Sequence, residues 1–255
     1  MKSMNFVWVA AALALAAPSG AEDFAWRGRL SPGQTLEVMG INGGITADAS
    51  GGEAEVTAVK RARHSDPASV EIKAVEHAGG VTICAVYPGR WGGRGNACEP
   101  GGDGGSTRNN DVQVEFTVKV PAGVKLKAHT VNGAVRVGEV DSDVDAASVN
   151  GSINVAATGV VKAETVNGSI EASMGRADWT GTLDFETVNG SITLGLPADL
   201  SADLDAETMN GRIDVDFPLG GNVHRTKREL RGTIGGGGRS LDLETVNGSI
   251  TLRKH

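Results

Sequence analysis

The sequence predicts an all-β protein that folds as a β-solenoid, a single-stranded β-helix or β-roll whose coils of about 20 residues stack along one axis. The phrase Thr-Val-Asn-Gly-Ser-Ile recurs with small variations, and in the regular copies its Asn steps by 18, 17, 22 and 21 residues. Apolar residues between the copies alternate with polar ones, and no long window shows helical spacing. The repeated pairs are Asn42-Gly43, Asn132-Gly133, Asn150-Gly151, Asn167-Gly168, Asn189-Gly190, Asn210-Gly211 and Asn247-Gly248.

The Asn-Gly pair also favours a two-residue hairpin, so an antiparallel hairpin array is the alternative fold. In a hairpin, Val166 and Ile170 would lie on opposite faces, which divides the apolar residues. A chain that continues through the pair as a bent, extended segment places Val166, Gly168 and Ile170 on one inward face. We therefore expect two short strands per coil, with the alternation slipping by one residue at the phrase. The inward glycines allow close backbone approach, and the asparagines stack along one edge, bonding backbone groups or one another.

Residues 1–21 have the features of a cleaved secretory signal. Lys2 supplies a positive start, residues 6–17 are apolar, and Ser19-Gly20-Ala21 forms a small-residue cleavage site. The apolar run is too short to span a bilayer. We expect export to the periplasm or cell surface of a bacterium, and no membrane span after cleavage.

Residues 22–123 are expected to form an N-terminal β region. Its alternating segments predict strands at 24–30, 36–39, 54–58, 70–74, 81–86 and 111–120. Cys84 and Cys98 lie 14 positions apart in a chain with an export signal. A disulfide between them is therefore expected, because exported proteins mature in an oxidising compartment.

This disulfide would close the start of a Gly-rich loop, residues 87–111. Within the loop, Trp91 lies near Arg90 and Arg94. Aromatic and arginine side chains are common binding anchors, so these three residues are a candidate ligand platform. The alternative is that Trp91 folds back over an end or edge of the solenoid.

Residues 124–255 hold the regular repeats, which are expected to continue directly from the preceding region. The step from Asn210 to Asn247 is 37 residues, close to two periods, and it includes a basic segment, residues 224–231, expected to be an exposed loop. The last phrase ends near the C-terminus, so the final coil would be capped by residues 252–255 or left partly open. Open ends and edges of sheets can pair with other strands.

The sequence contains no recognisable catalytic, metal-binding or cofactor-binding motif. The five histidines are scattered, and neither His-Glu-x-x-His nor Gly-x-Ser-x-Gly occurs. The Gly clusters lack the strand-to-helix context of a phosphate loop. The net charge of −7 argues against nucleic acid as a partner. We therefore predict a protein that is not an enzyme and needs no metal or cofactor.

The repeated phrase behind an export signal resembles a family of bacterial exported β-strand-repeat proteins called "putative adhesins" and classed as a domain of unknown function. The resemblance extends over Val81 to Pro88 with its Cys, the Gly-rich loop around Cys98, and Val112 to Val137 with its Val-Pro-Ala-Gly turn. It implies a β-solenoid or β-roll without a known active site.

The leading functional hypothesis is a non-enzymatic, adhesin-like binding or scaffold protein of the cell envelope, whose partner is an envelope protein or a surface polysaccharide. The first alternative is a structural protein that self-assembles through sheet edges or coil ends. The second is a polysaccharide-active β-helix enzyme, which would require carboxylates clustered on one outer face.

Overall fold

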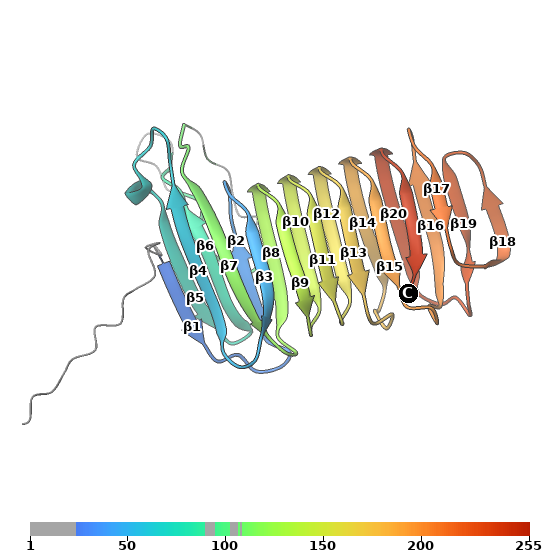
Figure 1. Ribbon diagram of the computed structural model, residues 1–255, viewed down its shortest axis with the longest axis horizontal. Coiled ribbons are helices and arrows are strands. Elements are labelled where there is room, and N and C mark those ends of the chain that lie inside the picture. Colours follow the sequence, from blue (N-terminus) through green and yellow to red (C-terminus); the bar gives the residue numbers. More distant parts are fainter. Residues whose placement is uncertain (1–23, 90–94, 103–106, 108) are drawn as a thin grey trace, which may run out of the picture.

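The computed structural model describes residues 24–255 except 90–94, 103–106 and 108. These residues form an elongated stack of two facing sheets (Figure 1). Sheet A contains, in spatial order, β1 (Phe24–Gly28), β4 (Ala54–Arg61), β7 (Gln113–Pro121), β3 (Ile45–Ser50), β9 (Val135–Val140), β11 (Ile153–Ala157), β13 (Ile170–Met174), β15 (Ile192–Leu196), β21 (Ile250–Lys254) and β17 (Ile213–Val215).

Sheet B lies opposite. It contains, in spatial order, β18 (Leu219–Arg225), β19 (Glu229–Ile234), β16 (Ala202–Thr208), β20 (Ser240–Asn247), β14 (Thr182–Asn189), β12 (Val161–Asn167), β10 (Val144–Asn150), β8 (Lys125–Asn132), β2 (Thr35–Met39), β6 (Gly80–Val86) and β5 (Glu71–His77). One short 3₁₀ helix, η1 (Pro67–Ser69), joins β4 to β5. Among the described residues, no helix has the length and apolar character needed to cross a bilayer.

Each coil contributes one strand to sheet B and the next strand to sheet A, and coils that are neighbours in the stack pair in parallel. Asn150, for example, is in register with Asn132 on one side and with Asn167 on the other. The inward residues of both sheets form one continuous apolar core along the stack. The predicted all-β solenoid is therefore confirmed, and antiparallel pairing is confined to strands near its two ends.

The structure corrects the predicted faces of the repeated phrase. Thr165 is buried and Val166 is 40% exposed, so the valine lies outside and the alternation changes phase at the Asn-Gly pair. The Thr165 hydroxyl donates to the carbonyl of Gly151 on the preceding coil (2.9 Å). A buried hydroxyl with a hydrogen-bond partner is tolerated in a core, which is why hydrophobicity alone assigned the wrong residue to the interior.

The glycines of the phrase do allow close approach, but toward the neighbouring coil and not toward the interior. A Cβ atom on Gly190 would overlap the carbonyl group of Gly168, and one on Gly168 would overlap that of Gly151. These corners therefore stack backbone against backbone, with no room for a side chain between them.

At the N-terminal end, the stack begins before residue 124. β6 and β7 form a coil outside the one made by β2 and β3, and both of its strands pair in parallel with that coil. Antiparallel strands then continue each sheet outward: β4 and β1 follow β7 in sheet A, and β5 follows β6 in sheet B.

At the C-terminal end, the structure corrects both expectations about the last coil. β20 and β21 lie between the coil of β14 and β15 and the coil of β16 and β17, so Ile250 is in register with both Ile192 and Ile213. The 37-residue step is therefore one coil plus the antiparallel pair of β18 and β19, which extends sheet B beyond β16. The C-terminal residues do not cap the solenoid, because the last coil is internal (Figure 1).

Candidate functional site

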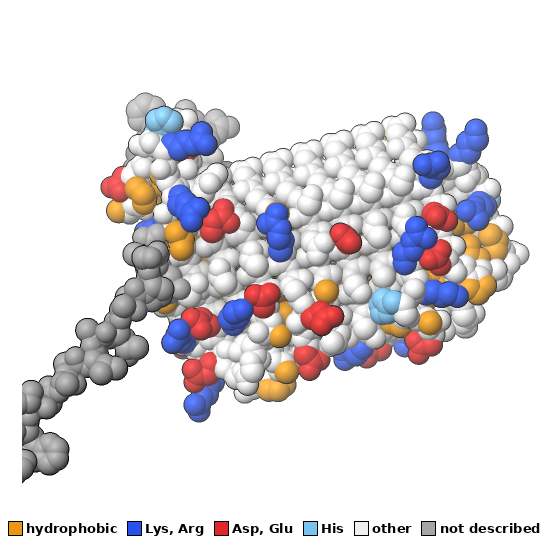
Figure 2. All heavy atoms as spheres, in the orientation of Figure 1, with side chains coloured by type: hydrophobic (Ala, Val, Ile, Leu, Met, Phe, Trp, Pro, Cys, Tyr) orange, Lys and Arg blue, Asp and Glu red, His pale blue; other side chains and the backbone are white. Residues whose placement is uncertain are grey.

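The Asn-Gly corner is a structural ladder. Each side-chain amide donates to the next along the stack, through the pairs Asn132–Asn42, Asn150–Asn132, Asn167–Asn150, Asn189–Asn167, Asn247–Asn189 and Asn210–Asn247, at 2.8–2.9 Å. Figure 2 shows an uncharged band along the edge of the stack where the strands of sheet B end. Because these amides bond one another, the corner is better suited to holding coils in register than to binding a ligand.

Two described residues of the Gly-rich loop, Tyr87 and Asn110, lie at the N-terminal end of this ladder. The Asn42 amide donates to the carbonyl of Asn110 (3.3 Å), and the buried Tyr87 hydroxyl donates to the carbonyl of Val112 (2.8 Å). Burial raises the pKa of Tyr87 to about 12, against a smaller opposing effect of its hydrogen bond to the Asn42 backbone. Trp91, Arg90 and Arg94, the predicted platform, lie outside the described residues, as do residues 1–21.

The predicted disulfide is present between Cys84 and Cys98. Nearby, Glu37 is only 3% exposed. Its carboxylate accepts hydrogen bonds from the Thr82 hydroxyl (2.7 Å) and the backbone N–H of Gly101 (3.0 Å). This buried carboxylate and the disulfide together hold the loop against sheet B, and we assign them a structural role.

The outer face of sheet B brings charged side chains together in straight rows. Parallel, in-register pairing places equivalent residues of successive coils about 4.8 Å apart. One row contains Lys127, Asp145, Lys162, Asp184, Asp242, Asp205 and Arg231. The next row contains His129, Ala147, Glu164, Glu186, Glu244, Glu207 and Glu229, and the corner row beyond it contains Val131, Val149, Val166, Val188, Val246 and Met209.

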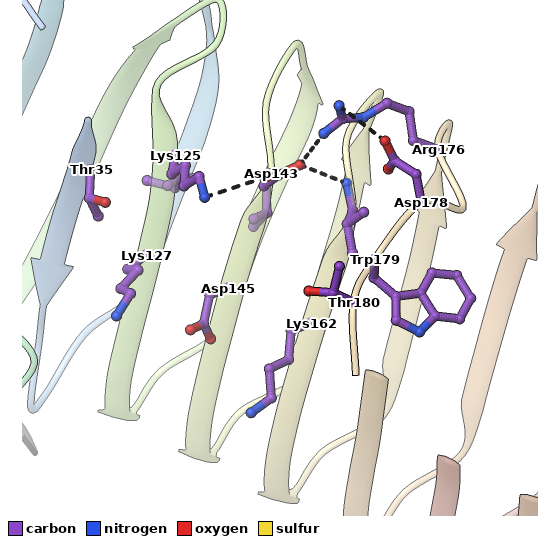
Figure 3. Close-up of a pocket in the computed structure, with 13 residues that line it drawn as sticks. Thr35, Lys125, Lys127, Asp143, Asp145, Lys162, Arg176, Asp178, Trp179 and Thr180 are labelled. Carbon is purple, nitrogen blue, oxygen red and sulfur yellow. Dashed lines mark hydrogen bonds and ion pairs between the residues drawn. The ribbon is translucent and has the colours of Figure 1, made fainter. Parts of the chain in front are cut away.

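The N-terminal half of this face holds a pocket of about 480 Å³ (Figure 3). Lys127, Asp145 and Lys162 lie side by side on three neighbouring strands. The loop after β13 covers one side, where Arg176 pairs with Asp143 (2.5 Å). Cationic groups outnumber carboxylates in the described lining, which suits the pocket to an anionic group.

The electrostatics keep the Asp145 carboxylate ionised. Burial raises its pKa, but the hydrogen bond and charge of His129, with the charges of Lys127 and Lys162, outweigh burial and lower the pKa below the ordinary value. The His129 Nε2 lies 3.2 Å from the Asp145 carboxylate.

Trp179 lines this pocket but is only 7% exposed. Its ring points away from the row of Lys127 and Asp145 (Figure 3), and its Nε1 donates to the carbonyl of Ser240 (2.9 Å). Trp179 therefore anchors the loop after β13 to the start of β20, and we do not assign it to a ligand platform.

The C-terminal half of the face is acidic and contains a shallow groove of about 290 Å³. We call it the glutamate–valine groove, because Glu164, Glu186 and Glu244 form one side and Val166, Val188 and Val246 form the other. Desolvation raises the pKa of Glu186, and the like charges of Glu164 and Glu244 raise it further.

Farther along the same rows, Asp205, Glu207 and Glu229 place carboxylate oxygens within 4.8 Å of one another, as in a metal site. The Arg231 guanidinium already contacts all three carboxylates at 2.9 Å. The hydrogen bond to Asp205 is the main cause of the raised pKa of Arg231. The position that a metal ion would take among these carboxylates is therefore occupied by a cation of the chain itself, which offsets one of the three negative charges.

Neither half of this face was predicted from the sequence. The residues of one row are far apart in the chain, and only the register brings them together. A signal was nevertheless present, since Glu164, Glu186 and Glu244 each begin the same string, Glu-Thr-Val-Asn-Gly. The clustered carboxylates that the enzymatic alternative requires are present on this face.

Comparison with curated proteins gives no match. Among solved structures, the chain is similar to a "putative cell adhesion protein" from Clostridium sporogenes, with 12% identity, a TM-score of 0.42, and coverage of 91% of this chain and 99% of that chain. It is also similar to a "putative adhesin" from Bacteroides fragilis, with 12% identity, a TM-score of 0.24, and coverage of 91% and 98%. Sequence identities and TM-scores this low establish no shared function.

The family comparison is decisive for classification. The model of the Toastrack DUF4097 family matches residues 43–253, from the first Asn-Gly corner to the last strand. It confirms the resemblance that the repeated phrase indicated. The chain belongs to the Toastrack DUF4097 family.

Proposed function

We propose that this protein is a non-enzymatic binding or scaffold protein of the bacterial cell envelope, and that it holds another macromolecule on the outer face of sheet B. The observation that carries the proposal is the composition of that face. Straight rows of charged side chains run along the stack beside an exposed apolar row. An extended charged surface with an apolar strip suits a macromolecule better than a small ligand.

Two features support an envelope location. Residues 1–21 have the composition of an export signal. The disulfide between Cys84 and Cys98 closes a loop that is anchored to sheet B, and disulfides of this kind persist in oxidising compartments.

The two sheet edges at the C-terminal end of the stack, β17 and β18, favour binding through a face over self-assembly through these edges. β17, at one end of sheet A, is three residues long and is followed by Asp216 and Pro218. β18, at the corresponding end of sheet B, has a shift in register between Gly220 and His224. Short, irregular and charged edges discourage pairing with another chain.

The carboxylate cluster gives a second candidate function, a polysaccharide-active enzyme. Glu186, with its raised pKa, would be the proton donor, since glycoside hydrolysis uses one protonated and one ionised carboxyl group. Incubating the protein with envelope polysaccharides and measuring new reducing ends tests this candidate. Reducing ends that appear with the wild type and disappear with Glu186→Gln would establish it in place of the binding function.

The test of the proposed function is capture of a partner from cross-linked cell envelopes by tagged protein comprising residues 22–255. The matched variants are Glu186→Gln with Glu244→Gln on sheet B, and Glu139→Gln, an exposed residue on β9 of sheet A. We expect one dominant partner with the wild type and with Glu139→Gln, and much weaker recovery with the sheet B variant. Recovery of the protein alone would overturn the proposal in favour of self-assembly.

A further inference from the structure

We propose that the glutamate–valine groove binds an extended, lysine-rich polypeptide segment of a partner protein, laid along the solenoid axis. This inference rests on the proposed function and names the chemistry of the partner. It joins three observations: carboxylates without an ion pair, an exposed apolar row beside them, and the length over which both continue.

The first observation is a gap in charge compensation. On one side of the gap, Lys162 pairs with Glu164 (2.8 Å), and on the other, Arg231 pairs with Asp205 and Glu207 (2.9 Å). Between them, β14 and β20 carry four carboxylates that lie within ion-pair distance of no described lysine or arginine: Asp184, Glu186, Asp242 and Glu244. The charge of Lys162 acts on Asp184 and Glu186 from the neighbouring strand without forming an ion pair with either. Like charges opposite each other in a sheet repel, so cations from outside the chain would stabilise this segment.

The second observation is the exposed apolar row. Of the five large apolar side chains exposed in the described part of the chain, four lie on this corner row of sheet B: Val149, Val166 and Val188 at 40%, and Met209 at 58%. A lysine side chain matches such a surface, because its aliphatic stem can cover a valine while its ammonium group reaches the neighbouring glutamate. A metal ion would make no use of the valines.

The third observation is length. From Val149 to Met209 the row crosses five adjacent strands of sheet B, which correspond to about 19 Å at the usual strand spacing. An extended segment of about six residues spans that distance. The groove follows the middle of this path, with lining residues on four of the five strands, β10, β12, β14 and β20.

The test uses a fluorescein-labelled hexalysine peptide and the protein comprising residues 22–255, with binding followed by fluorescence anisotropy. We expect binding that weakens with added salt, and about tenfold weaker binding for the double variant Glu186→Gln with Glu244→Gln. The double variant Val166→Ser with Val188→Ser should also bind several-fold more weakly. The control, Glu139→Gln on sheet A, should bind as the wild type does. Circular dichroism checks that all variants are folded.

Three outcomes would overturn the inference. Unchanged affinity of the glutamate variant would show that the peptide binds elsewhere. Unchanged affinity of the valine variant would show that the peptide is held by charge attraction alone and makes no contact with the valines of the groove. Competition by the linear polyamine spermine at a lower concentration than unlabelled hexalysine would identify a small polycation as the ligand.

The envelope capture experiment separates this inference from the proposed function. If the wild type and the glutamate variant capture the same partner equally well, the groove is not the binding site, but the proposed binding function is supported. If hexalysine binds through the groove but no envelope partner is recovered, the proposed envelope function is refuted, but the groove's affinity for a lysine-rich segment is supported.

Discussion

Each residue of the repeated phrase is placed by a different physical constraint. Thr165 can be buried because its hydroxyl donates a hydrogen bond to the Gly151 carbonyl. Val166 lies outside because it follows the inward Thr165, and successive side chains of a strand point to opposite faces. Gly168 is required because the backbone of Gly151, on the preceding coil, occupies the space where its Cβ would lie. Packing between coils, more than the hydrophobicity of single residues, therefore decides which side chains enter the core.

The corner glycines give the first prediction. Gly190→Ala should lower the free energy of unfolding by about 2–4 kcal/mol, because the new Cβ would overlap the backbone of Gly168. Gly52→Ala is the matched control, since nothing lies within 4 Å of its Cβ position and its φ is not positive. Urea unfolding measures both. Equal effects of the two substitutions would contradict the close approach of the corners.

Tyr87 gives the second prediction. It is the one tyrosine of the chain, so the near-ultraviolet absorbance of tyrosinate reports this residue alone. Burial raises its pKa to about 12, above the ordinary 10.0, so the folded state holds the proton more tightly than the unfolded state does. We expect titration near pH 12 in the folded protein and near pH 10 in the denatured protein.

The same shift links Tyr87 to stability. Its contribution is fully present below pH 10 and is lost as the pH rises toward 12. Tyr87→Phe should therefore show a smaller loss of stability between pH 10 and pH 12 than the wild type. A folded-state titration near pH 10 would show that the hydroxyl is accessible to water, contrary to its buried position.

At the scale of elements, two ladders follow from the same in-register pairing. The asparagine ladder adds side-chain hydrogen bonds between coils, because each amide has both a donor and an acceptor. The glutamate ladder places like charges side by side, which opposes the same pairing. A destabilising glutamate ladder on the exposed face of sheet B favours a binding role for that face.

The asparagine ladder gives the third prediction. Asn167→Ala removes two side-chain hydrogen bonds, one to Asn150 and one from Asn189, and should cost about 1–2 kcal/mol of stability. Asn154→Ala, which removes a single exposed bond to Glu171, should change stability by less than about 0.5 kcal/mol. Thermal unfolding of both variants measures the difference. Identical melting temperatures would mean that the ladder contributes no net stability.

At the scale of the whole molecule, stability depends on contacts between neighbouring coils. The last segment of the chain, β20 and β21, lies between two coils that precede it in sequence. β16 and β17 therefore have no parallel partner until the C-terminal coil is in place. The order in which the chain is synthesised differs from the order in which its coils stack.

The internal position of the last coil gives the fourth prediction. Truncation after Gly238 should remove hydrogen-exchange protection from β17, which loses its parallel partner β21. Protection of β16 should weaken, because it loses β20 and keeps only its antiparallel partner β19. β10 and β12, which lie farther inside the stack, should stay protected. Removal of His255 alone is the control. Unchanged protection of β17 in the truncated protein would contradict the interleaved order of coils.

The sequence by itself determined the solenoid class, the Asn-Gly corners and the disulfide between Cys84 and Cys98, because each depends on a local period or on a pair of residues with a known chemistry. Only the tertiary structure decided which coils are neighbours. The coils are so similar that many stacking orders satisfy the same local pattern, and the structure adopts one of them. That order aligns Glu186 with Glu244, residues 58 positions apart in sequence, and so creates the acidic groove.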